Sequence, residues 1–208
     1  MIITGLIFSS GGSEVCLHTE IGDFSVTLAD ARRLGFESLN EEDFPFEFED
    51  EQKLELLAQK LKAIKYCTYL LSFSDKSSSS LLKKLREKQY CPEVCTLDTL
   101  KESGIIDDYA LCLRKLCALS REKLYGPYRL KSELLAKGFC AHDVQNALDD
   151  AQLDFDSTLY ELCKKLVRTS KVDFSDMAQV SKFKAKISRY GYGFDAINAV
   201  IDKLLPEF

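Results

Sequence analysis

The stretch "GPYRLKSELLAKGF", residues 126–139, contains the signals that begin and end a short helix. Pro127 suits the first helical turn, because its missing N–H would have no partner there. Gly138 suits the position just beyond the helix, where the backbone turns left-handed. Leu130 and Leu134 share one face at a spacing of four residues. The stretch therefore predicts a helix of about three turns with one apolar face.

The charged side chains of this helix allow two readings. Arg129, Glu133 and Lys137 follow one another at steps of four, so that ion pairs can form along the helix. Each such pair contributes only about 0.2–0.5 kcal/mol. We interpret Glu133 as mostly structural, whereas the two cations can serve either the ion pairs or a binding partner.

The same pattern returns in "LLKKLREKQY" (81–90) and in "FKAKISRYGY" (183–192). In each copy, apolar residues at helical spacing precede a basic residue, a turn position and an aromatic residue. The aromatic residues Tyr90, Phe139 and Tyr192 recur at intervals of about fifty residues, a period typical of helical repeat proteins. One aromatic at the same turn in every copy indicates a core position rather than a stacking platform for bases.

The N-terminal region differs from the rest of the chain. Short β-branched segments separated by turns predict a small β-meander of three strands, followed by a short helix that ends at Gly35. An acidic connection comes next, in which we expect Pro45 to block regular structure. From about Asp50 onward helical patterns dominate.

We therefore predict a mainly α fold, with three tandem three-helix repeats in an elongated, curved array preceded by a small N-terminal β-meander. Ser77 is the expected N-cap of one helix, Asp107 or Asp108 of another, and Gly104 the expected glycine after a helix end. The predicted boundaries are 1–49 for the β-rich acidic leader, 50–106 for repeat 1, 107–153 for repeat 2 and 154–208 for repeat 3.

Composition indicates an ordinary globular protein, with 46% hydrophobic and 29% charged residues among 208. No apolar run approaches 18 residues and the N-terminus does not resemble a signal peptide, so we expect a cytoplasmic protein. Neither a phosphate-binding glycine loop nor an HExxH motif occurs. The paired acids at 107–108 and 149–150 are better explained as helix caps or solvated ends than as catalytic dyads. We predict no catalytic site and no cofactor.

The eight cysteines lack the spacing of a disulfide framework or a zinc site, since no CxxC pair occurs. Cys91 and Cys95 are four residues apart, and Cys140 lies close to His142. Most cysteines lie in or beside apolar helical stretches, where a reduced thiol packs as a small hydrophobe. We predict structural thiols and no metal site.

Charge is distributed unevenly along the chain, whose net charge is −5. Residues 1–60 hold 13 acidic and 4 basic residues, whereas the remaining region is mildly basic. Basic residues recur at helical spacing there, and stacked repeats could align them into a track for phosphates or an acidic protein groove. The alternative is that they only solvate outer helix faces. The candidate binding residues are Lys83, Lys84, Arg86, Lys88, Arg114, Arg121, Arg129, Lys137, Lys182, Lys186 and Arg189.

Three ordered motifs resemble the RecX family of recombinase regulators over nearly the whole chain. They are "GIIDD" (104–108), "YGPYRLKSELLAKGF" (125–139) and "KISRYGYGFDAINAVI" (186–201). The first copy departs from the family pattern, because Gln89 stands where a glycine is usual. The structural motif residues carried by the resemblance are Asp107, Asp108, Gly126, Glu133, Gly138 and Gly191.

The resemblance implies a cytosolic, non-enzymatic helical protein that binds the RecA–DNA filament. Such a protein restrains strand exchange, ATP turnover and co-proteolysis, within homologous recombination, DNA repair and the SOS response. It also implies weak direct DNA binding, and we expect a monomer without a membrane contact. The alternative reading is a helical DNA-binding module that acts independently of RecA. The acidic leader could be a second contact surface, a self-inhibitory cover or a solubilising cap.

Overall fold

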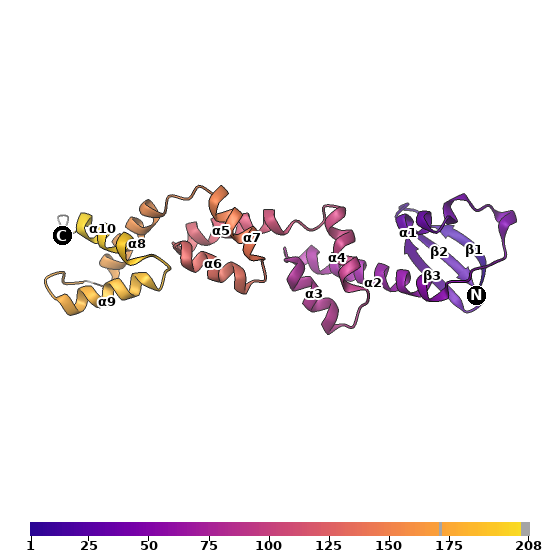
Figure 1. Cartoon of the computed structure of the whole chain (residues 1–208), viewed down its shortest axis with the longest axis horizontal. Helices are drawn as coiled ribbons and strands as arrows, with labels where there is room; N and C mark the ends of the chain where they lie inside the picture. Colours follow the sequence, from indigo (N-terminus) through magenta and orange to yellow (C-terminus); the bar gives the residue numbers. More distant parts are fainter. Residues whose placement is uncertain (171, 205–208) are drawn as a thin grey trace. The chain divides into compact units, whose positions relative to one another are not determined.

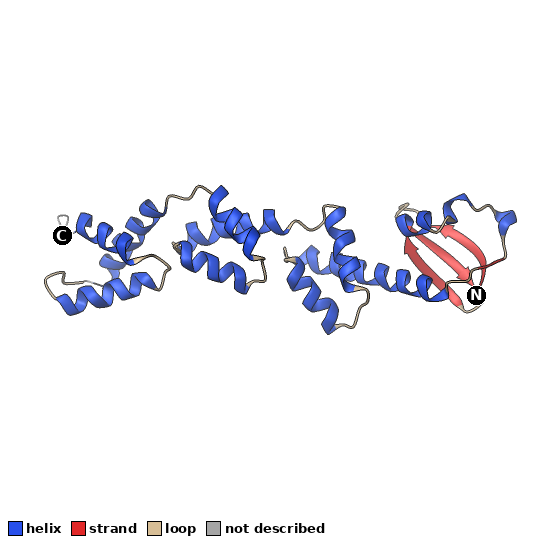
Figure 2. Cartoon of the chain, in the orientation of Figure 1, coloured by secondary structure: helices blue, strands red, loops and turns tan. Residues whose placement is uncertain are grey.

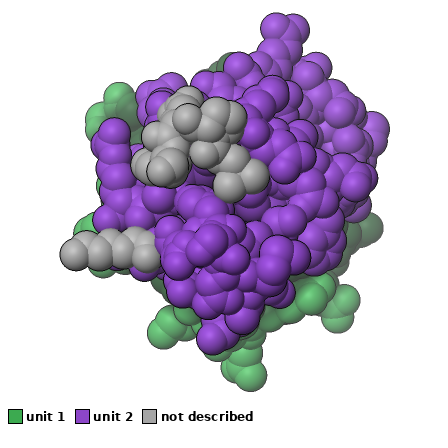
Figure 3. All heavy atoms as spheres, turned by 90° about the vertical axis from the view of Figure 1, so that its left-hand side faces the viewer, with its two compact units in different colours: residues 1–106 green, residues 107–208 purple. Residues whose placement is uncertain are grey.

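The computed structural model of the chain describes residues 1–170 and 172–204. Within these residues the protein is mainly helical, with ten α-helices and a small N-terminal antiparallel sheet, as predicted (Figure 2). Contacts divide it into two compact units, Met1–Ile106 and Asp107–Phe208, which are coloured separately in Figure 3. Each unit has its own buried clusters and is described by itself.

The sheet contains the three expected strands β1 (Ile2–Phe8), β2 (Glu14–Thr19) and β3 (Gly22–Thr27), in an antiparallel meander (Figure 1). A fourth strand, β4 (Phe46–Glu47), pairs with β1 and gives the order β3-β2-β1-β4. This strand corrects the expectation of an irregular connection around Pro45. Proline is tolerated there because β4 is a short edge strand and Pro45 precedes it.

Alternating burial on the strands creates one apolar face. Ile3, Val15, Leu17 and Val26 are fully buried, together with Leu54. The helices of this region are α1 (Leu28–Arg33), two short 3₁₀ helices (Phe36–Ser38 and Glu41–Asp43) and α2 (Glu51–Phe73). The core of the leader therefore includes the first part of α2, beyond the predicted boundary at residue 49.

The second half of α2 packs against α3 (Ser78–Glu87) and α4 (Glu93–Glu102). Ala63 and Cys67 of α2 meet Leu81 and Leu85 of α3 in a buried cluster. Ser77 caps α3 as predicted, since its hydroxyl accepts a hydrogen bond from the Ser80 backbone N–H.

Unit 2 begins with α5 (Asp108–Lys123), α6 (Pro127–Ala136) and α7 (Ala141–Asp150). Leu130 and Leu134 are fully buried with Phe139, which confirms the predicted apolar face and the core position of the aromatic residue. Asp107 is the N-cap of α5 and accepts a 2.8 Å hydrogen bond from the Ala110 N–H.

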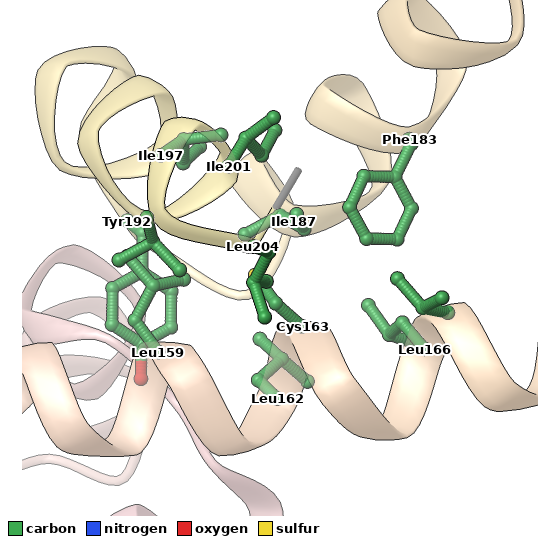
Figure 4. Packing of buried hydrophobic residues seen from close by; sticks show 12 residues of the cluster. Leu159, Leu162, Cys163, Leu166, Phe183, Ile187, Tyr192, Ile197, Ile201 and Leu204 are labelled. Carbon is green, nitrogen blue, oxygen red and sulfur yellow. The ribbon is translucent and has the colours of Figure 1, made fainter. Parts of the chain in front are cut away.

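The last three helices are α8 (Phe155–Ser170), α9 (Met177–Ser188) and α10 (Phe194–Leu204). Side chains from all three interdigitate in one buried cluster, in which Leu162 of α8 lies below residues of α9 and α10 (Figure 4). Tyr192 belongs to this cluster, as its repeat position predicts. The predicted third repeat extends to residue 208, but residues 171 and 205–208 lie outside the described residues.

The turn after the first helix of each motif copy is left-handed in all three copies. The φ angles are 56° at Gln89, 84° at Gly138 and 91° at Gly191. Gln89 thus adopts the conformation that the other copies assign to glycine, at a cost of about 1–2 kcal/mol. This agreement supports three related units, although the number of repeats and the curvature of the array stay predictions.

Candidate functional site

Two glycines join the start of α6 to the turn after α9 inside unit 2. The Gly126 N–H donates to the Tyr190 carbonyl at 2.8 Å, and the Tyr128 N–H donates to the Gly191 carbonyl at 3.2 Å. A Cβ atom on Gly126 would lie 2.5 Å from the Gly191 oxygen, and one on Gly191 would lie 2.3 Å from the Arg129 nitrogen. Both positions therefore require glycine because backbone meets backbone. We call this contact the glycine junction.

The side chain of Arg129 stabilises the glycine junction. Its Nη1 donates to the Arg189 carbonyl at 2.8 Å, and its Nη2 to Glu133 Oε1 at 3.2 Å. Its guanidinium carbon lies 4.5 Å from the centre of the Tyr125 ring, a cation–π contact. The side chain is 37% exposed, and its buried Nε has no hydrogen-bond partner among the described residues. These contacts support a structural role for both Arg129 and Glu133.

Three candidate cations form a row on α9 and the residue that follows it. Lys182, Lys186 and Arg189 are exposed at i, i+4 and i+7, so they line one face of the helix. Their neighbours Phe183 and Ile187 are buried and hold the helix against the core. We call these three cations the α9 row. Because Arg129 bonds to the Arg189 backbone, the row ends at the glycine junction.

The other candidates in unit 2 are exposed and lie on other helices. Arg114 and Arg121 lie on α5, and Lys137 is the C-cap of α6. Lys186 also donates to Ser170 Oγ at 3.1 Å, which ties the α9 row to the end of α8.

The remaining four candidates lie in unit 1, on α3 and its C-cap. Lys83 and Lys88 are exposed, and Lys84 and Arg86 take part in ion pairs. Lys84 Nζ lies 2.7 Å from Glu87 Oε2, and the hydrogen bond with Lys84 lowers the pKa of Glu87. Arg86 Nε lies 3.4 Å from Glu93 Oε1. Nearby carboxylates thus offset part of the positive charge on α3.

Sequence reasoning missed two exposed aromatic side chains beside the glycine junction. Tyr128 is 69% exposed at the start of α6, and Phe194 is 63% exposed at the start of α10. A Cβ atom on Gly193 would lie 3.7 Å from Tyr128 Cε2, so the Tyr128 ring lies close to the chain just before Phe194. The sequence offered one signal for these exposed side chains, because each is an aromatic residue in the first turn of its helix and lies off the apolar face.

The eight cysteines lie in described parts of the chain and are free thiols. Burial raises the pKa of Cys67 to about 11, of Cys112 to about 11 and of Cys163 to about 12. These three thiols stay protonated at neutral pH and pack as apolar groups, which confirms the structural role predicted for them. In addition, none of the described helices has the length and apolar character needed to span a membrane.

No protein-family model matches the chain. Relatives named regulatory protein RecX are similar in sequence. The relative from Pseudomonas savastanoi pv. phaseolicola is 28% identical over 135 residues, which cover 64% of this chain and 84% of the relative. The relative from Chlorobium phaeobacteroides is 24% identical over 145 residues, 69% of this chain and 93% of the relative.

A solved structure is similar in fold. The crystal structure of a regulatory protein RecX matches with a TM-score of 0.74 and 18% identity, over 96% of this chain and 98% of that one. The match supports the mainly helical architecture with its small N-terminal sheet.

Proposed function

Because these sequence relatives and the shared fold support the RecX family for this chain, we propose that it is a regulator of the RecA recombinase. In this proposal the chain binds the RecA–DNA filament and restrains strand exchange, ATP hydrolysis and co-protease activity. It does so as a binding protein, without a reaction of its own.

The observation that carries the proposal is the α9 row beside the glycine junction. Its three exposed cations stand on a helix whose opposite side is anchored by Phe183 and Ile187 in the core. A row of positive charge on an anchored helix suits DNA phosphates or acidic side chains of a filament groove, because the backbone that carries the charges is already ordered before binding. Such contacts are screened by salt, so filament binding should weaken as ionic strength rises.

The exposed aromatic pair at the junction complements this charged row. Tyr128 and Phe194 are large apolar groups that water surrounds in the free protein. Aromatic side chains flanked by arginine are typical of interface hot spots, which supports the junction as part of the docking surface.

The first prediction concerns charge reversal of the α9 row. We expect the triple variant Lys182→Glu, Lys186→Glu, Arg189→Glu to bind the RecA–DNA filament at least tenfold more weakly, because like charges then face phosphates or acidic groups. The measurement is inhibition of RecA ATP hydrolysis and of strand exchange over a range of regulator concentrations. Circular dichroism should show unchanged helix content, since all three side chains are exposed.

A matched control reverses three other exposed cations of unit 2, namely Lys165, Arg168 and Lys203. It changes net charge equally but leaves the α9 row intact, so we expect nearly normal inhibition. Equal inhibition by the two triple variants and the unaltered protein would show that the α9 row only solvates the helix. Tight binding to naked DNA by a protein that leaves RecA activity unchanged would instead favour the independent DNA-binding module.

A further inference from the structure

A thiol, an imidazole and a carboxylate meet on the solvent side of the N-terminal sheet. On β2, Val15 and Leu17 face the core, so Cys16 and His18 project from the opposite face. Asp23 of β3 lies directly across from His18 in the antiparallel register. The strand pairing thus brings three side chains of different chemistry to one place on a regular backbone.

The donor atoms of these side chains are close together. Cys16 Sγ, one ring nitrogen of His18 and one carboxylate oxygen of Asp23 all lie within 4.8 Å of one another. His18 Nδ1 is 2.7 Å from Asp23 Oδ1. The side chains of His18 and Asp23 are 38% and 61% exposed, so an ion can reach them from solvent and water can complete its coordination.

A glycine of the neighbouring strand lies beside the imidazole. Gly5 of β1 is the register partner of His18 on its other side. A Cβ atom at Gly5 would stand 3.7 Å from His18 Cδ2, so the imidazole ring lies beside the backbone of β1. The ring is thus placed between β1 and Asp23 of β3.

We propose that Cys16, His18 and Asp23 form a zinc-binding site. Thiolate and imidazole donors favour zinc over magnesium or calcium, which prefer oxygen ligands. Zinc bonds of about 2.0–2.3 Å place neighbouring donors of a tetrahedral site about 3–4 Å apart. The donor atoms already lie within 4.8 Å of one another, and the 2.7 Å contact between His18 and Asp23 has to lengthen slightly to reach this spacing.

Binding follows a simple proton balance. The Cys16 thiol releases its proton to solvent and keeps the electron pair, which the thiolate sulfur donates to the ion. His18 binds as the neutral imidazole and Asp23 as the carboxylate, and a water molecule takes the fourth position. The site departs from our expectation of purely structural thiols. In the sequence the site is visible only as Cys16 and His18, two residues apart on a predicted strand. Cys140 and His142 have the same spacing but lie at the start of a helix.

The test uses cobalt(II) as a spectroscopic substitute for zinc on the full-length protein. We expect one cobalt ion per chain, with a sulfur-to-cobalt charge-transfer band that added zinc removes. Cys16→Ser should abolish the band, and His18→Gln should weaken zinc binding at least tenfold. The matched control is Cys140→Ser, which removes the thiol of the other Cys-x-His pair and should leave band and affinity unchanged.

A second measurement needs no variant. Zinc should slow the alkylation of Cys16 by iodoacetamide in the unaltered protein at least fivefold, as followed by peptide mass spectrometry, while the exposed Cys95 reacts at an unchanged rate. The proposal is overturned if Cys16 is not protected, if the charge-transfer band survives in Cys16→Ser, or if it disappears in Cys140→Ser. None of these outcomes depends on the RecA proposal.

Discussion

Glycine is required in this chain for two different reasons, a left-handed backbone conformation and close packing against another segment. Gly104 and Gly191 both have positive φ angles, of 71° and 91°. A Cβ atom on Gly104 would meet nothing within 4 Å, whereas one on Gly191 would overlap the backbone of Arg129. Gly126 has an ordinary φ of −79° and is required because the Gly191 backbone and the Tyr192 ring approach it. The left-handed conformation is the reason for glycine at position 104, close packing is the reason at position 126, and both reasons apply at position 191.

This difference gives a graded prediction for alanine substitutions. Gly104→Ala should lower the free energy of unfolding by about 1 kcal/mol, the cost of a left-handed alanine. Gly126→Ala should lower it by about 1–3 kcal/mol through overpacking. Gly191→Ala combines both effects and should cost about 2–4 kcal/mol.

Urea unfolding followed by circular dichroism measures all three variants. Gly104→Ala is the control, because it changes the backbone preference without a steric contact. If Gly104→Ala and Gly191→Ala were equally destabilised, the glycine junction would not be a tight contact in solution.

At the scale of elements, α2 is shared by two cores. Its first part contributes Leu54 to the core of the sheet, and its second part contributes Cys67 to the cluster with α3 and α4. Between these parts, the Lys60 ammonium lies 3.1 Å from the Asp30 carboxylate of α1, with both side chains almost fully buried. The Thr27 hydroxyl also donates to this carboxylate at 2.7 Å. α2 is therefore part of the folded N-terminal region and is not only a linker that follows it.

The buried pair allows a double-mutant prediction. Lys60→Met should lower the free energy of unfolding by about 3–5 kcal/mol, because the buried Asp30 carboxylate then keeps only the exposed Arg33 guanidinium, at 3.9 Å, as a partner charge. The double variant Asp30→Leu, Lys60→Met should lose less stability than Lys60→Met alone, since it removes both charges.

Chemical denaturation of the two single variants and the double variant closes the thermodynamic cycle. Additive losses would contradict the prediction, because they would mean that the two charges do not interact. The exposed Lys65–Glu14 pair, at 2.7 Å, is the control, and its removal should cost at most about 1 kcal/mol.

At the scale of the molecule, the two units have separate cores. The buried clusters of unit 2 are composed entirely of residues after 107, including Leu130 and Phe139 in one and Leu159 and Ile187 in the other. Phe155 and Leu124 extend between these clusters, and the glycine junction adds backbone hydrogen bonds. Unit 2 thus has what a chain of its size needs to fold without unit 1.

We therefore predict that residues 107–208, expressed alone, form a helical protein with one cooperative urea transition. Its m value should be about 1–2 kcal/mol/M, as for other small domains. Because the chain contains no tryptophan, tyrosine fluorescence serves as the second probe, and its transition should coincide with that of circular dichroism. A gradual, non-cooperative loss of signal would show that unit 2 depends on unit 1.

Much of this protein could be read from its sequence because the relevant signals are local. Pro127 and Gly138 bracket α6, Ser77 and Asp107 cap their helices, and the apolar spacing defines the faces that are buried. Each of these depends on the conformational preference of one residue or on a period of about 3.6 residues. The same local logic failed for β4, whose pairing with β1 joins segments over forty residues apart.

The candidate site was predictable only in part. Helical spacing placed the α9 row on one face, and the exposure of its cations agrees with that placement. Spacing did not reveal that Arg129 reaches across to the Arg189 carbonyl, because that hydrogen bond joins residues 60 positions apart. It also did not bring Cys16, His18 and Asp23 together, since their proximity depends on strand register.

Local preferences account for the helices, their caps and the apolar faces that they bury, because each of these follows from interactions among a few neighbouring residues. The packed structure was needed to show that Gly126 and Gly191 touch, that Asp30 and Lys60 are buried together, and that a thiol, an imidazole and a carboxylate converge on the sheet. Such contacts form between residues far apart in the sequence. They depend on strand register, on side-chain volume and on how closely two backbone segments approach, and these follow only from how the helices and strands pack.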